Sequence, residues 1–216
     1  MPSTAPQELT RPSWEQRSRA RVGDRALLRS HQVIRAARQL VADGGLEAVS
    51  LRPLLERSGL SRRAFYARFS GMDDVLLALY EDTMTTGAVQ LSRRIAGIES
   101  PIARLEALVR AMASISQRQT RDRIYMLAMS SQHVRLAEQR PDDLVEATRP
   151  MTGLMAAILA EGMQAGQIRR TDPDALAQTI YALVTSEIHR SFHLGRRGRS
   201  WIDELCTFCL HGIGLA

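Results

Sequence analysis

Residues 50–69, SLRPLLERSGLSRRAFYARF, constrain the fold more than any other part of this 216-residue chain. The stretch predicts two short helices joined by a tight turn, because Gly59 can adopt the positive φ that ends a helix and Ser61 can cap the next one. Phe65 and Phe69 are four residues apart and share one face of the second helix, which is expected to be buried. The other side chains of this helix then point elsewhere; they are Arg62, Arg63, Tyr66 and Arg68. A helix-turn-helix of this kind places its second helix in the DNA major groove.

The flanking segments extend this pair to a three-helix unit. Residues 28–43 carry their apolar side chains on one stripe and are followed by Gly44-Gly45, which predicts a helix before the pair. Ser50 is placed to cap the first helix of the pair. Asp73 and Asp74 open a further helix, where the helix dipole favours acidic side chains.

In these features the chain resembles the TetR family of bacterial transcriptional repressors. The Gly-Leu-Ser turn, the Phe65-Tyr66 pair, Phe69 and the apolar start of the following helix carry the resemblance, which covers about residues 29–80. The resemblance implies an N-terminal DNA-binding domain, followed by a helical domain that binds a small ligand and forms a homodimer.

From Val75 onward the apolar pattern is helical almost without interruption. Six further helices are expected, over about residues 75–97, from 101, 121–139, 141–165, from 173, and from 201. No strand alternation and no internal repeat is present in the sequence, so the predicted fold is all-α with about nine helices.

The expected domain organisation has three parts. Residues 1–28 are interpreted as a flexible basic N-terminal arm, although Trp14 could instead mark a short extra helix. Residues 29–74 form the helix-turn-helix domain, and residues 75–216 form the ligand-binding and dimerisation domain. Residues 1–74 hold 13 Arg against 8 acidic residues (+5), and residues 75–216 hold 16 against 15 (+1). The positive charge therefore accompanies the predicted DNA module.

Specific roles follow for the side chains of the helix-turn-helix. Arg62 and Arg63 lie at the N-terminal end of the recognition helix, where a bidentate arginine–guanine contact is worth about 1–3 kcal/mol of discrimination. Ser50, Ser61 and the Tyr66 hydroxyl are expected to contact phosphates. Arg68 could contact either bases or phosphates. A solvated surface charge is the alternative for each arginine.

A single recognition helix covers only a few base pairs, whereas a symmetric dimer reads two half-sites of a palindromic operator about 34 Å apart. The resemblance implies that the last two helices pair with their symmetry mates. Candidate interface residues are Leu183, Ile188, Trp201, Leu205 and Phe208. The alternative is that these stripes cover only the core of their own domain.

The resemblance also implies a pocket for an apolar or amphipathic small-molecule effector. Flexible methionines and aromatic residues suit an adaptable pocket, and they suit an ordinary core equally well. The candidates are Met112, Tyr125, Met126, Met129, Met155, Tyr181 and Phe192.

Other chemistry has little support in the sequence. Cys206 and Cys209 form a CxxC within a predicted helix without a second cysteine pair, and His189 and His193 lack a third metal ligand. No P-loop, GxGxxG, HExxH or GxSxG motif occurs. No enzyme activity, cofactor or metal is expected. The chain also lacks an apolar run of about 20 residues and a signal-peptide core, so a cytoplasmic protein is expected.

The sequence therefore predicts a sequence-specific DNA-binding transcriptional regulator, with repression relieved by a small ligand as the favoured mode. Two alternatives remain open. One is a DNA-binding regulator controlled by a protein partner or by cysteine redox state, without a small-molecule pocket. The other is an enzyme or carrier built on a helical bundle, in which the basic helix is incidental.

Overall fold

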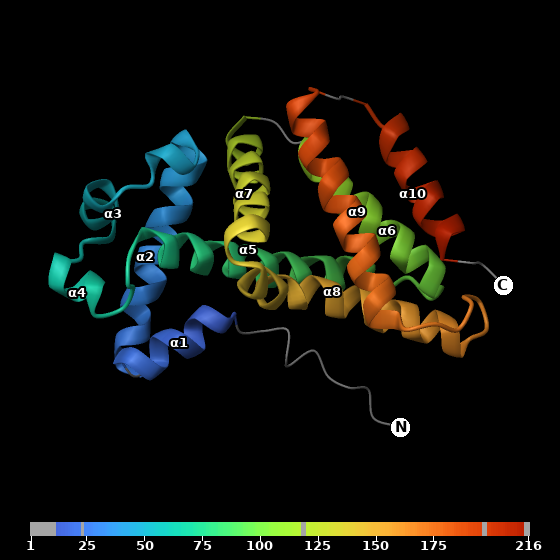
Figure 1. The fold of residues 1–216 in the computed structure, drawn as a ribbon, viewed down its shortest axis with the longest axis horizontal. Helices are drawn as coiled ribbons and strands as arrows, with labels where there is room; N and C mark the ends of the chain where they lie inside the picture. Colours follow the sequence, from blue (N-terminus) through green and yellow to red (C-terminus); the bar gives the residue numbers. More distant parts are fainter. Residues whose placement is uncertain (1–11, 23, 118–119, 196–197, 214–216) are drawn as a thin grey trace. The chain divides into compact units, whose positions relative to one another are not determined.

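The computed structural model describes residues 12–22, 24–117, 120–195 and 198–213, and over these residues the chain is all-α (Figure 1). Its α-helices are α1 (Ser13–Val22), α2 (Asp24–Gly44), α3 (Leu51–Ser58), α4 (Arg62–Tyr66), α5 (Met72–Ile95), α6 (Pro101–Ala113), α7 (Thr120–Gln139), α8 (Pro141–Gln164), α9 (Pro173–His193) and α10 (Ser200–Gly212). Two short 3-10 helices, η2 (Leu46–Ala48) and η3 (Ser114–Gln117), follow α2 and α6.

The nine helices expected from the sequence correspond to α2–α10, and α1 is additional. The largest difference in a boundary is at α2, which begins at Asp24 and not near residue 28. Helix α10 begins at Ser200, one residue before the expected start, and Arg199 occupies its N-cap position. Residues 196–197, between α9 and α10, lie outside the described residues.

The chain forms two compact units. The first comprises Met1–Thr86 and Gln119–Thr148, and the second comprises Gly87–Arg118 and Arg149–Ala216. Helices α5 and α8 each contribute residues to both units. The units therefore differ from the expected division at residue 74, because α7 and the N-terminal parts of α5 and α8 belong with the helix-turn-helix.

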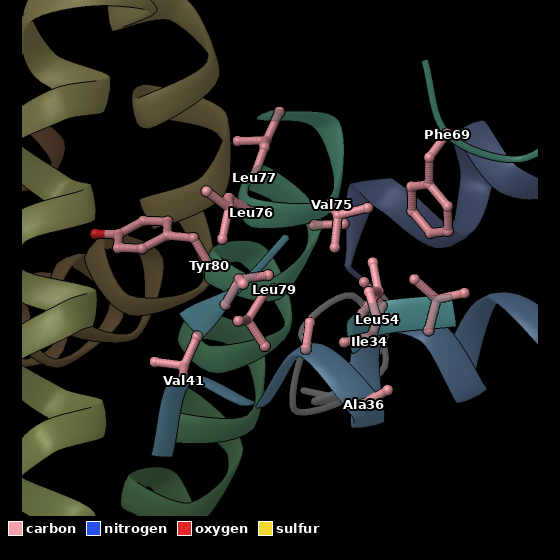
Figure 2. Close-up of a cluster of buried hydrophobic side chains, with 14 of the residues drawn as sticks. Ile34, Ala36, Val41, Leu54, Phe69, Val75, Leu76, Leu77, Leu79 and Tyr80 are labelled. Atoms are coloured by element: carbon pink, nitrogen blue, oxygen red, sulfur yellow. The ribbon is translucent and has the colours of Figure 1, made fainter. Parts of the chain in front are cut away.

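The core of the first unit is built around α2, which contacts both α3 and α7. Figure 2 shows Ile34 and Val41 of α2 in one cluster with Leu54 of α3 and with Val75 and Leu79 of α5; all five are buried. These are the apolar positions of the helical patterns, and burying each such side chain contributes about 1.5–3 kcal/mol. The core thereby fixes α3 and the start of α5, the elements on either side of α4.

Helix α1 packs against this unit, in contrast to the flexible arm expected over residues 1–28. The Trp14 side chain is 2% exposed, and its ring lies edge-on to the ring of His31, with centroids 4.8 Å apart. The short extra helix that Trp14 could mark in the sequence is therefore present over Ser13–Val22. Residues 1–11 of the expected arm lie outside the described residues.

In the second unit, α6 packs against both α9 and α10. The buried side chains of α6 include Leu105, Leu108 and Val109, and those of α9 include Ile180 and Val184.

No helix in the described part of the chain is long and apolar enough to cross a membrane.

Candidate nucleic-acid interface

The turn between α3 and α4 has the geometry that the sequence predicts. Gly59 adopts φ +68° and donates its N–H to the Leu55 carbonyl at 2.9 Å, which ends α3 in a left-handed cap. Leu60 is buried inside the turn. Ser61 then caps α4, because its Oγ accepts the Ala64 N–H at 3.2 Å.

Helix α4 has one buried face and one open face. Phe65 is 1% exposed and its ring stacks on that of Phe69, with centroids 5.8 Å apart. Arg62 and Arg63 are exposed, and Tyr66 is 55% exposed on the side left open by Phe65. Within the described part of the chain, neither arginine forms an ion pair. Both guanidinium groups are therefore available to an anionic or hydrogen-bonding partner.

The two serines at the helix starts differ in their contacts. Ser50 occupies the N-cap position of α3, but its side chain makes no capping hydrogen bond and is exposed. Ser61 uses its Oγ as a cap acceptor, and its hydroxyl proton remains a potential donor. Both hydroxyls can thus donate to a phosphate at a helix N-terminus, where the dipole also favours an anion.

Arg68 differs from the other candidates, and the expectation that it points away from the domain is wrong. Arg68 is 7% exposed, and its Nη1 donates to the Ala64 carbonyl at 2.6 Å. Burial lowers the pKa of this guanidinium, and the nearby Arg29 acts in the same direction. Helix α4 ends at Tyr66, so Arg68 lies beyond the helix and its direction is not set by helical spacing.

The residues predicted to line a ligand pocket are divided between the two units. Four of them belong to the second unit, namely Met112, Met155, Tyr181 and Phe192, and three belong to the first, namely Tyr125, Met126 and Met129. Tyr125 has a specific structural partner, because its hydroxyl is hydrogen-bonded to Thr83 Oγ1. Burial raises the pKa of Tyr125.

A cavity of about 430 Å³ lies in the second unit and is lined by none of those seven residues. Its walls come from the end of α5 and the loop that follows, from α6, and from the start of α10. The lining residues are Arg94, Ile95, Ile98, Ala107, Arg110, Ala111, Ser114, Arg199 and Ile202. Arg110 pairs with Glu106 at 2.9 Å and also with Asp203. Arg94 and Arg199 form no ion pair with the described residues, so the cavity combines apolar walls with unpaired positive charge.

The predicted dimer residues also differ in exposure. Ile188, Trp201 and Leu205 are buried within the single chain, and Leu183 is half-buried. Phe208 of α10 is 66% exposed, and it is the predicted interface residue with the most apolar surface left uncovered.

The remaining reactive side chains that the sequence singles out are two cysteines of α10 and two histidines of α9. Cys206 and Cys209 are both buried free thiols, and burial raises the pKa of Cys209 to about 11. A thiol that stays protonated is a poor nucleophile and oxidises slowly. The rings of His189 and His193 lie 4.4 Å apart, and no third His, Cys, Asp or Glu joins them into a metal-binding group among the described residues.

Two family models match the chain. The model described as bacterial regulatory proteins of the tetR family matches residues 33–79, which contain the helix-turn-helix. The model described as a tetracyclin repressor-like C-terminal domain matches residues 99–189. A protein of Mycobacterium bovis described as an uncharacterised HTH-type transcriptional regulator is 27% identical over 161 residues, covering 73% of this chain and 78% of that protein.

Solved structures with the same fold include proteins with bound ligands. RolR in complex with resorcinol aligns with a TM-score of 0.72 and 15% identity, over 88% of this chain and 90% of that chain. FadR of Bacillus subtilis in complex with stearoyl-CoA aligns with a TM-score of 0.67 and 16% identity, over 85% of this chain and 98% of that chain. At these identities the likeness concerns the fold.

Proposed function

The chain belongs to the TetR family of bacterial transcriptional regulators and is a DNA-binding regulator, and on this premise we propose that it is a homodimeric repressor released from its operator by a small ligand. The observation that carries the proposal is the open face of α4. Phe65 anchors the helix, while Arg62, Arg63 and Tyr66 remain exposed. An exposed, unpaired arginine near the N-terminus of a recognition helix suits bidentate contact with guanine.

Homodimer formation is supported by size and by surface chemistry. One short helix such as α4 reads only a few base pairs, so specificity requires two half-sites. Phe208 on α10 leaves a large aromatic surface uncovered in the single chain, and Leu194 at the end of α9 is 62% exposed. Covering these side chains with a second copy would bury apolar surface at the cost of little polar desolvation.

An amphipathic ligand is supported by the cavity in the second unit. Ile95, Ile98 and Ile202 offer apolar contact, and Arg94 and Arg199 offer guanidinium groups that form no ion pair with any described residue. Such a lining suits an apolar molecule with an acidic group. The ligand-bound complexes of RolR and FadR show that proteins of this fold hold small molecules.

Release from DNA would follow from a population shift. In one conformer the spacing of the two recognition helices does not match the operator. A ligand that binds this conformer more tightly lowers operator occupancy, by an amount set by the difference in its affinity for the two conformers. A coupling free energy of about 1–3 kcal/mol is sufficient for a 5- to 150-fold change in affinity. Helix α5 runs from the helix-turn-helix into the second unit, so it connects the two along the chain.

The proposal is tested by selecting bound duplexes from a random pool with the wild type and with Arg63→Ala. A palindromic motif that the variant loses or relaxes at one position would support it. Arg170→Ala is the matched control, since Arg170 is exposed in the second unit and its loss removes the same charge. Weak, salt-sensitive binding without a motif would contradict sequence-specific recognition.

A further inference from the structure

We propose that α1 is a clamp on the recognition helix and that Arg21 is its positioning residue, which holds the C-terminal end of α4 against the start of α5. The inference rests on the proposed function, because a clamp matters for operator binding only if α4 reads DNA. Arg21 lies outside the helix-turn-helix motif and would act through the position of α4, without contact to a base.

Helix α4 needs support at both ends. It has only five residues, and so short a helix is unstable in isolation because nucleation is costly. Its N-terminal end is fixed by the Ser61 cap. At its C-terminal end, the carbonyls of Arg63 and Phe65 accept backbone N–H groups from residues 67–69, which leaves the Ala64 carbonyl for a side-chain donor.

Arginine side chains make two further contacts here, one to α4 itself and one to the residues that follow it. Arg68 Nη1 donates to the Ala64 carbonyl at 2.6 Å, and Arg21 Nη1 donates to the Arg68 carbonyl at 3.1 Å. Both cations lie at the negative end of the α4 dipole, which favours them. Arg68 thus holds the last turn of α4, and Arg21 of α1 holds the segment that directly follows it.

The same Arg21 nitrogen also contacts α5. It lies 3.3 Å from Asp74 Oδ2, and this oxygen accepts both the Ser70 N–H and the Ser70 hydroxyl at 3.1 Å. Asp74 stands in the first turn of α5. Arg21 and Asp74 together therefore connect the end of α4, the linker at Ser70 and the start of α5.

Helix α1 is itself anchored on α5 and α2, so Arg21 is presented from a fixed support. Glu81 of α5 is 2% exposed. Its carboxylate accepts hydrogen bonds from the backbone N–H of Trp14 at 2.6 Å and from Arg17 Nη2 at 2.9 Å. Ser18 and Ser30 exchange a hydrogen bond of 2.6 Å between α1 and α2. Only the Glu81 side of this ion pair is buried, and its desolvation offsets the attraction to Arg17, so the pair adds little net stability but fixes one register of α1.

The test compares Arg21→Ala with the wild type on the selected operator, at several salt concentrations. Operator affinity should fall about tenfold, as for the loss of one charge-assisted hydrogen bond, while the slope of log K against log salt stays unchanged. If Arg21 instead contacts a phosphate directly, the slope will fall by about 1 and the clamp is overturned. Arg121→Ala is the matched control, since it removes an equal charge and an ion pair to Asp43 at 2.6 Å in the same unit without touching α1 or α4. The control should bind like the wild type.

Amide hydrogen exchange of the free dimer gives a second readout that needs no DNA. The N–H groups of Arg68 and Phe69 donate to the Phe65 carbonyl, at 2.8 and 3.0 Å, and should exchange faster in Arg21→Ala but not in Arg121→Ala. Unchanged exchange, or faster exchange with unchanged operator affinity, would overturn the clamp. If the wild type selects no motif, the proposed function fails, and the exchange rates alone decide whether Arg21 holds α4.

Discussion

The two ends of α4 carry the same residue type in opposite environments. At the N-terminal end, Arg62 and Arg63 are exposed and form no ion pair within the described residues. Just past the C-terminal end, Arg68 is buried and bonded to the Ala64 carbonyl. The difference follows from helix chemistry, because free N–H groups at one end repel a cation and free carbonyl groups at the other attract it. An arginine in a recognition segment is therefore not evidence of a DNA contact until its place along the helix is known.

The largest expected effect comes from removing the buried aromatic side chain of α4. Phe65→Ala should destabilise the first unit by about 3–5 kcal/mol, because a buried aromatic ring is replaced by a cavity beside Phe69. Urea unfolding checks the loss of stability, and operator binding should disappear with it. A loss below about 1 kcal/mol would mean that α4 is held mainly by its polar end contacts.

Arg68→Ala should separate the two ends of α4. We expect a destabilisation of about 1–2 kcal/mol, because the Ala64 carbonyl loses a charged donor, together with weaker operator binding and an unchanged selected motif. Arg62→Ala is the matched control, and its unfolding free energy should stay within about 0.5 kcal/mol of the wild type. If Arg68→Ala instead relaxes the motif at a defined base pair, Arg68 reads DNA and the contrast between the two ends is incorrect.

Helical periodicity was sufficient to predict most of this fold. The stripes of apolar residues and the Gly, Pro and Asp residues at their ends predicted all nine helices from α2 to α10. The sequence did not decide whether α1 forms, because Trp14 is the only large apolar side chain in the first two turns of this helix. The packing of α1 depends on hydrogen bonds to Ser30 and Glu81, which are distant in sequence. No local pattern reveals such partners.

The site was predictable where helical spacing holds and unpredictable past the end of the helix and where packed helices leave a gap. The exposure of Arg62, Arg63 and Tyr66 follows from their spacing relative to Phe65. The burial of Arg68 does not, because the helix ends two residues before it. The cavity in the second unit was missed for a related reason. An apolar stripe shows which face of a helix is buried, but it does not show where the packed faces leave a gap.

Substituting the two serines at the helix starts should have effects of intermediate size. Ser61→Ala should cost about 1 kcal/mol of stability, because the Ala64 N–H loses its cap, whereas Ser50→Ala should cost almost nothing, because Ser50 makes no capping bond. Both variants should bind the operator more weakly if both hydroxyls donate to phosphates. Thermal unfolding gives the change in stability of each variant, and operator titration gives its change in affinity. A negligible stability loss in Ser61→Ala would mean that the cap at Ser61 adds nothing to the fixing of α4.

The smallest expected effect concerns the anchor of the clamp and depends on pH. Burial raises the pKa of Glu81 above its ordinary value of 4.5, although Arg17 and the Trp14 N–H act against this shift. A carboxyl group with a raised pKa binds its proton more tightly in the folded state. Its contribution to stability is therefore fully present below about pH 4.5 and is lost as the pH rises through the raised value. The unfolding free energy of the wild type relative to Glu81→Gln should thus decrease with rising pH across that window and be constant above it. A relative stability that increases with pH would mean that Arg17 outweighs desolvation, so that the ion pair stabilises α1 in addition to fixing the register from which Arg21 reaches the end of α4.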